Sequence, residues 1–213
     1  MDLIYKSVVK VECGSNEGSA VCVHTSNSVG HVFLTCSHVV RYKTGPVILR
    51  HNDNVIKGKV IFAVRKGVPF DIAIILSEKT INIVACQISD ENPVINQEVF
   101  AVGYPSIEKK LKISFGHIHA TPLSSILTTN CQVYLGFSGG PVFGKDNKLL
   151  GLTIGMLNVG TVNFILPSSV FKQVIKNYIT KNDIIVLENL ESKCPKTKMI
   201  WNNGVPNLNL CHF

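Results

Sequence analysis

The sequence predicts an all-β protein that ends in a helix and a tail. Short apolar runs recur between turn signals made of Asn, Gly and Pro, which is the rhythm of strands in an antiparallel barrel. The runs form two sets, separated by a polar break at Ser89–Pro93. We therefore expect an N-terminal β-barrel in residues 1–88, a C-terminal β-barrel with a helix in residues 94–180, and a tail in residues 181–213.

Each set contains six candidate strands. The first six are Lys6–Val11, Ser19–His24, His31–Thr35, Val47–Arg50, Val55–Val64 and Asp71–Leu76. The second six are Glu98–Val102, Lys112–His119, Cys131–Tyr134, Pro141–Phe143, Leu149–Met156 and Thr161–Leu166. After them, Ser168 can cap a helix that runs through Thr180, because apolar residues recur there with a helical period.

The stretch Gly136–Pro141 reads G-x-S-G-G-P and lies between two apolar runs. A serine hydroxyl attacks a carbonyl group only if a base removes its proton and donors stabilise the resulting oxyanion. Glycine on both sides of Ser138 allows a tight turn that points backbone N–H groups toward the hydroxyl. The pattern therefore indicates a nucleophile, although the same glycines also suit an ordinary hairpin.

Candidates for a base and for its orienting acid lie upstream. His38 follows the apolar run His31–Thr35 beside small residues, which leave room for a substrate. Asp71 opens a continuous apolar run, where a buried carboxylate needs a partner such as an imidazole N–H. The alternative interpretation of Asp71 is a turn residue after Pro69. If His38 is the base, activity rises with pH through an apparent pKa of roughly 6.5.

The composition limits the other classes of function. Of the 213 residues, 46% are hydrophobic and 16% are charged, which argues for a buried globular core. No run of apolar residues is long enough for a membrane span, and the first residues lack the pattern of a secretory signal. The net charge of +7 is scattered over the candidate strands and the tail, so we expect a solvated basic surface and no nucleic-acid partner.

The seven cysteines are odd in number and form no C-x-x-C pair, so they indicate neither a disulfide framework nor a zinc ribbon. They favour a reduced intracellular compartment. His117 and His119 share one face of a candidate strand, but two histidines alone do not complete a zinc site. We therefore expect no metal and no cofactor, and we leave a homo-oligomer open.

Three motifs carry a resemblance to a known family: T-x-x-H-V at residues 35–39, D-I-A-I at residues 71–74 and G-x-S-G-G-P at residues 136–141. In this order they resemble the chymotrypsin-like serine proteases. The similarity is closest to the Deg/HtrA branch and covers residues 5–180. The resemblance implies two packed six-stranded β-barrels with a catalytic triad in the cleft between them.

The same resemblance implies a role for each candidate residue. His38 would be the general base and then the general acid, Asp71 its orienting carboxylate, and Ser138 the nucleophile. The backbone N–H groups of Gly136 and Ser138 would form the oxyanion hole.

A narrower resemblance is to the peroxisomal leader peptide-processing proteases, which carry a long region before their protease domain. It rests on Thr129–Val133, Leu149–Leu152, Val162–Pro167 and Ile200–Trp201. It implies protein substrates, namely leader-bearing peroxisomal enzymes cut near a cysteine, and it implies a peroxisomal location. The last three residues, Cys211-His212-Phe213, differ from a Ser-Lys-Leu type of peroxisomal signal.

Three further positions bear on specificity and activation. Gln132 lies six residues before Ser138, where trypsin-like enzymes place the aspartate of their specificity pocket. Together with Asn163, it predicts a neutral pocket that does not favour Lys or Arg. Phe137 stands where trypsin-type enzymes carry an aspartate that pairs with a freshly cut N-terminus. Since a phenylalanine cannot make that ion pair, we expect activity to need no such cut.

The leading hypothesis is a serine endopeptidase with the triad His38, Asp71 and Ser138. The alternatives are a Deg/HtrA-like quality-control protease, a viral chymotrypsin-like protease that cuts a polyprotein, and a non-catalytic binding module with a protease fold. A fluorophosphonate labels an activated serine, so it separates the enzymes from the module. Mapping the cleavage sites then separates the enzymes from one another.

Overall fold

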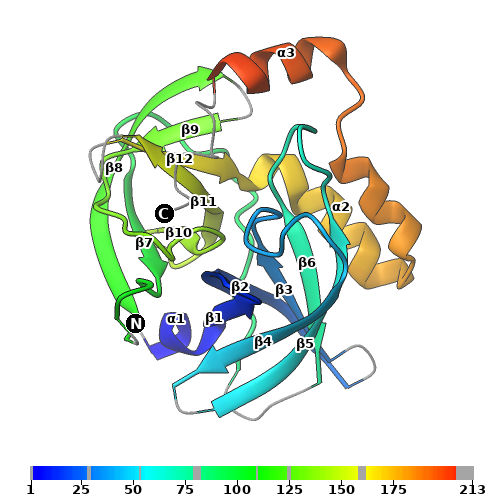
Figure 1. Ribbon diagram of the computed structural model, residues 1–213. Coiled ribbons are helices and arrows are strands. Elements are labelled where there is room, and N and C mark those ends of the chain that lie inside the picture. Colours follow the sequence, from blue (N-terminus) through cyan, green and yellow to red (C-terminus); the bar gives the residue numbers. More distant parts are fainter. Residues whose placement is uncertain are drawn as a thin grey trace.

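Two closed antiparallel β-barrels make up most of the computed structural model (Figure 1). The structure describes residues 2–27, 30–52, 54–78, 83–108, 110–123, 126–157 and 162–204. The first barrel follows a short helix, α1 (Asp2–Ser7), and its strands are arranged in the order β1-β2-β3-β6-β5-β4. These strands are β1 (Val8–Cys13), β2 (Asn16–Ser26), β3 (Gly30–Thr35), β4 (Gly45–His51), β5 (Asn54–Ala63) and β6 (Ala73–Ser77).

The second barrel has the strand order β10-β11-β12-β9-β8-β7. Its strands are β7 (Glu98–Gly103), β8 (Lys112–Leu123), β9 (Ile126–Thr129), β10 (Pro141–Gly144), β11 (Leu149–Leu157) and β12 (Val162–Pro167). Two six-stranded antiparallel barrels followed by a helix are the fold class that the sequence predicts, and this prediction is confirmed.

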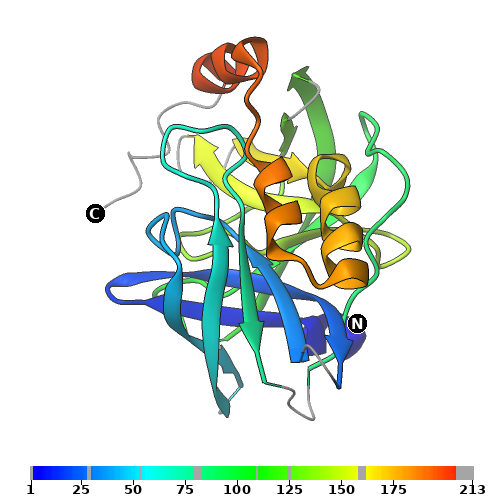
Figure 2. The same ribbon diagram turned by 90° about the vertical axis from the view of Figure 1, so that its right-hand side faces the viewer.

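Three helical elements follow the barrels: α2 (Ser168–Lys181), the 3₁₀-helix η1 (Ile184–Leu190) and α3 (Pro195–Gly204). Figure 2 shows α2 and η1 side by side against the barrels, with α3 at one end of the molecule. Helix α2 buries Phe171, Ile175 and Tyr178, which recur with the period of one helix face. Among the described helices, none is long and apolar enough to cross a membrane.

The alternation of side chains explains why the barrels have an inside and an outside. In β4, Val47 and Leu49 are buried, whereas Ile48 between them is 41% exposed. In β3, all residues are buried, because both of its faces are covered. The largest apolar core contains residues of both barrels, such as Phe33 from the first and Phe143 from the second. The two barrels therefore share one packed interior, which fixes residues of one barrel relative to the other.

The chain passes from one barrel to the other at residues 86–87. The N–H of Cys86 donates to the Cys22 carbonyl in the first barrel at 2.9 Å, and the Gln87 carbonyl accepts from Leu149 in the second barrel at 2.8 Å. The expected domain limits at residues 88 and 94 stay a prediction.

Two local predictions are wrong. Residues 131–134, expected as a strand, lie outside the ladders, and the strand is β9 at Ile126–Thr129. The reason is that side chains replace the ladder after β9: Thr129 Oγ1 donates to the His117 carbonyl at 2.9 Å, and Asn130 Oδ1 accepts the His117 N–H at 2.8 Å. This lets the chain leave the barrel and turn toward Ser138.

The second wrong prediction is the cap of α2. Pro167, with φ −69°, precedes the first helical residue, and no side chain caps the helix. Ser168 is already inside the helix and is buried, and its hydroxyl has no hydrogen-bond partner among the described residues.

Candidate active site

Ser138 lies on a tight turn between β9 and β10. Gly136 and Gly139 have φ values of +97° and +81°, a conformation that residues with a Cβ rarely adopt. A Cβ at Gly136 would lie 2.3 Å from the Tyr104 carbonyl oxygen, and one at Gly139 would lie 2.3 Å from the Ser19 carbonyl oxygen. Gly136 and Gly139 are therefore required by the backbone angle and by the close approach of other chain segments.

Some N–H groups of the turn donate to backbone carbonyl oxygens and others do not. The N–H groups of Phe137, Gly139 and Gly140 donate to backbone carbonyl oxygens at 3.0, 2.8 and 2.8 Å. Within the described part of the chain, the N–H groups of Gly136 and Ser138 take part in no such backbone hydrogen bond. Two unused donors on one turn are the arrangement that an oxyanion site needs.

Ser19 on β2 holds this turn from the first barrel, a role that the sequence analysis missed. Its hydroxyl donates to the Gly136 carbonyl oxygen at 2.7 Å and accepts the Tyr104 N–H at 2.9 Å. Its own N–H donates to the Ser138 carbonyl oxygen at 2.8 Å. The local sequence offers one weak signal for this role: Ser19 is a polar residue within residues 18–23, the buried part of β2.

His38 follows β3 and Asp71 precedes β6, and these two strands are paired neighbours in the first barrel. Nδ1 of His38 lies 2.5 Å from Oδ2 of Asp71, and the His38 backbone N–H donates to Oδ1 at 3.0 Å. With Nδ1 bound to the carboxylate, Nε2 is the nitrogen left to accept a proton. The two contacts with Asp71 thus fix the orientation of the imidazole ring.

The environment of this pair shifts the protonation of the imidazole. The Asp71 side chain is only 6% exposed and the His38 side chain is 16% exposed. Burial lowers the pKa of His38, whereas the negative charge of Asp71 and its hydrogen bond raise it. The net result is a pKa above the ordinary value of 6.5.

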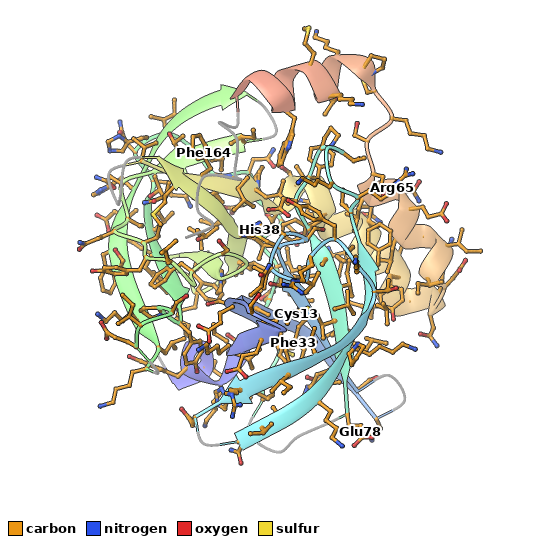
Figure 3. All side chains as sticks on the ribbon, in the orientation of Figure 1. Cys13, Phe33, His38, Arg65, Glu78 and Phe164 are labelled. Carbon is orange, nitrogen blue, oxygen red and sulfur yellow. The ribbon has the colours of Figure 1, made fainter. Side chains whose placement is uncertain are left out.

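His38 and Ser138 line one pocket, although they belong to different barrels. In Figure 3, His38 lies near the middle of the molecule, between the two barrels. The rest of the lining is Val133, Leu135, Thr153, Ile154, Gly155 and Met156. The structure therefore brings His38, Asp71 and Ser138 to one place with a mostly apolar wall beside them.

The two predicted specificity residues lie next to this pocket rather than among the residues that line it. Gln132 is exposed. Asn163 is fully buried on β12, and its Nδ2 donates to the Cys131 carbonyl oxygen. Its Oδ1 is buried without a hydrogen-bond partner in the part of the chain that the structure describes. The role of both residues in specificity stays a prediction.

One group of described side chains has the donor types of a metal site: Cys36, His38 and Asp71, whose ligand atoms lie within 4.8 Å of one another. Their chemistry favours acid–base work instead. The His38 nitrogen and the Asp71 carboxylate bind each other, and burial raises the pKa of the Cys36 thiol, which donates to the Thr153 carbonyl oxygen at 3.3 Å. His117 and His119 are both exposed and lie outside this group.

Phe137, the residue before Ser138, is completely buried. Its ring contacts Tyr134 edge-on, at 5.7 Å between the ring centroids, and belongs to an apolar cluster inside the second barrel. Phe137 therefore contributes apolar packing to the second barrel and has no charge with which to form an ion pair.

A double β-barrel with a glycine-bounded serine and a His–Asp pair at one pocket is the architecture of a chymotrypsin-like serine protease. The model of the trypsin-like peptidase domain matches residues 18–152. The chain belongs to this family of trypsin-like peptidases and is a serine endopeptidase, a hydrolase of peptide bonds.

Two curated relatives refine the comparison. The chain is 27% identical to the peroxisomal leader peptide-processing protease of Homo sapiens, over 92% of this chain and 37% of that protein. It is also 27% identical to the protein of the same name from Mus musculus, over 92% of this chain and 36% of that protein. The chain thus spans little more than a third of the relatives that it matches.

Solved structures share the fold. The serine endoprotease from Yersinia pestis has a TM-score of 0.69 and 21% identity, over 85% of this chain and 66% of that one. The protease Rv3671c from M. tuberculosis H37Rv, in an inactive serine-to-alanine form, has a TM-score of 0.67 and 20% identity, over 83% of this chain and 89% of that one. At this identity the likeness concerns the fold alone.

Proposed function

We propose that Ser138, His38 and Asp71 are the catalytic triad of this serine endopeptidase. The observation that carries the proposal is the pocket that His38 shares with Ser138, with Asp71 bound to the far nitrogen of the imidazole. The three residues come from two barrels and from distant parts of the sequence. Chance is a weaker explanation for a serine, a histidine and a buried aspartate that lie together in the arrangement that proton transfer from the serine requires.

The geometry supports a two-step acyl transfer. Ser138 Oγ attacks the carbonyl carbon of the peptide, and Nε2 of His38 takes the hydroxyl proton while Asp71 stabilises the imidazolium. The negative oxygen of the tetrahedral intermediate accepts from the N–H groups of Gly136 and Ser138. His38 then gives its proton to the leaving amine, and the acyl-enzyme is hydrolysed by a water molecule that His38 deprotonates.

The experiment that tests the triad is covalent labelling. The wild-type chain should react with a fluorophosphonate at Ser138, as located by mass spectrometry of the labelled peptide. The same probe separates an enzyme from a binding module with a protease fold, which would give no labelled serine. Labelling at another residue, or none at all, would contradict the proposal.

The finer proposal is that the chain processes leader peptides of peroxisomal matrix proteins near a cysteine, in the peroxisome. Its support is the similarity to the two relatives of that name over 92% of this chain. The apolar pocket wall of Val133, Ile154 and Met156 agrees with a neutral substrate side chain. A cysteine side chain gains only about 1 kcal/mol in such a pocket, so flanking contacts must supply part of the selectivity.

Cleavage mapping tests this finer proposal. We would incubate the chain with a leader-bearing peroxisomal enzyme and with a random peptide pool, using Ser138→Ala as the matched control. Cuts near cysteine, faster in long leader segments than in short peptides, are expected. Cuts after Lys or Arg with none near cysteine would reject the specificity, and broad cutting of unfolded proteins would favour a quality-control protease.

A further inference from the structure

The loop that joins β5 to β6 carries Asp71 (the Asp71 loop, residues 64–72). Phe70, directly before Asp71, has a φ of +74°, which is a genuine outlier for a bulky aromatic residue. The Ile72 N–H donates to the Phe70 carbonyl oxygen at 2.8 Å and closes a tight turn around Asp71. The direction of the Asp71 side chain therefore depends on Phe70 keeping a positive φ, a backbone conformation that is unfavourable for this residue type.

Trp201 on α3 holds Phe70 from outside the loop. The two rings meet edge to face, with centroids 5.7 Å apart and an angle of 86° between their planes. Trp201 is only 8% exposed and belongs to the same apolar core as Val64 at the start of the loop. The contact therefore fixes the side chain of the one residue in the loop whose backbone is unfavourable.

A second contact joins the same C-terminal segment to the loop. The Arg65 guanidinium binds the Glu191 carboxylate in a bidentate pair, with Nε–Oε1 at 3.0 Å and Nη2–Oε2 at 2.7 Å. The Arg65 backbone N–H also donates to Oε1 at 3.3 Å. Figure 3 shows Arg65 beside the C-terminal segment. Glu191 directly follows η1, whose Leu190 is fully buried in the core.

We propose that the C-terminal segment, residues 184–204, braces the Asp71 loop and that Trp201 is a positioning residue for Asp71. This inference rests on the proposed catalytic role of Asp71. Without the Trp201 ring, Phe70 is free to leave the left-handed region, and the peptide group that it shares with Asp71 rotates with it. The carboxylate then no longer meets both Nδ1 and the backbone N–H of His38. The pocket wall on the second barrel is left as it was.

The test measures kcat, KM and the pH profile of Trp201→Ala in the full chain. We expect kcat to fall about 10- to 100-fold, as for other small misplacements of catalytic groups, with little change in KM. The rising limb of kcat/KM should move to lower pH, because Asp71 is what raises the pKa of His38. Met199→Ala is the matched control, since Met199 is on the same helix and 59% exposed, and it should leave kcat unchanged.

A rescue experiment separates positioning from mere packing. Asn accepts a positive φ more readily than Phe, so Phe70→Asn in the Trp201→Ala background should restore part of kcat. A loss of packing energy alone would not be repaired in this way. Arg65→Ala provides a variant that should fold, since the Arg65 side chain is 73% exposed, and it should lower kcat with KM unchanged.

Two results would overturn the inference. One is a folded Trp201→Ala protein with the wild-type kcat and pH profile, and the other is a double variant with Phe70→Asn that shows no rescue. If Trp201→Ala does not fold, an unchanged kcat in Arg65→Ala overturns the brace. Failure of the proposed function looks different: the wild-type chain itself would then match Ser138→Ala and take up no fluorophosphonate.

Discussion

The hydroxyl of Ser19 donates to the Gly136 carbonyl oxygen at 2.7 Å, across the boundary between the two barrels. This bond fixes the peptide group next to the proposed oxyanion donors. It does so from a strand that contains neither the nucleophile nor the base. The shape of the Ser138 turn therefore depends on the first barrel as well as on its own glycines.

Ser19→Ala should lower both activity and stability. The change leaves the Gly136 carbonyl and the Tyr104 N–H without their partner, which costs about 1–3 kcal/mol for a buried group. We expect kcat to fall about 10-fold or more because the turn is displaced. The matched control is Ser7→Ala: Ser7 is equally buried, and its hydroxyl donates to the Ile4 carbonyl at 2.9 Å, away from the pocket. Steady-state kinetics and urea unfolding of both variants measure the two effects. Equal kcat values for Ser19→Ala and Ser7→Ala would contradict the role of Ser19.

Ser138→Ala should remove turnover and keep the fold. Loss of the nucleophile in a triad costs about 10⁶-fold in kcat, while the oxyanion donors and substrate binding remain. Circular dichroism and the unfolding midpoint should match those of the wild type. Turnover near the wild-type rate by the folded variant would refute the assignment of Ser138.

The pH dependence of kcat/KM should follow the protonation of His38. A protonated imidazole cannot act as a base, so activity rises with pH as His38 loses its proton. Because Asp71 raises the pKa of His38 above 6.5, the midpoint of the rise should lie above 6.5 rather than at the value expected for a free histidine. The sequence analysis expected an apparent pKa of roughly 6.5, and the contact with Asp71 moves this expectation upward.

The variant Asp71→Asn tests whether Asp71 is the cause of the raised pKa of His38. It removes the charge that raises the pKa and leaves the burial that lowers it, so the remaining activity should rise at lower pH than in the wild type. The rate itself should drop by about 10⁴, as for loss of the triad acid in enzymes of this class. A profile that keeps its wild-type midpoint would argue against Asp71 as the partner of His38.

Phe137→Ala should destabilise the second barrel by about 3–5 kcal/mol, the usual cost of removing a fully buried aromatic ring. Chemical denaturation with the wild type as reference measures the loss. Because Phe137 offers no charge for a new N-terminal amine, residues added before Met1 should leave kcat/KM nearly unchanged. Activation by orders of magnitude after an N-terminal cut would contradict this use of Phe137.

The fold and the candidate triad could be predicted from the sequence because each depends on local signals. Alternating apolar residues mark the strands, and a histidine or aspartate at a strand end is visible in one line of sequence. The position of β9 was predicted wrongly, at Cys131–Tyr134, because the strand is defined by its pairing with the distant strands β8 and β12, which the local sequence does not show. Ser19 and Trp201 were missed as parts of the site because their partners, Gly136 and Phe70, are remote in the chain and only folding brings them together.

The pairing of β11 has a consequence for how the protein can bind the main chain of a substrate. On one side β11 pairs with β12 as far as Leu157, but on the other its pairing with β10 ends at Leu152, and Thr153 makes the last backbone bonds, to Gly139 and Gly140. Beyond that point, the backbone of residues 154–156 runs along the pocket with one side unmatched among the described residues. An extended substrate chain beside these residues would form backbone hydrogen bonds at every second residue, whatever its side chains. Methylating single amide nitrogens of a peptide substrate should therefore weaken binding at every second position. Such an alternation would indicate recognition of the main chain, which substitution of the substrate's side chains would not reveal.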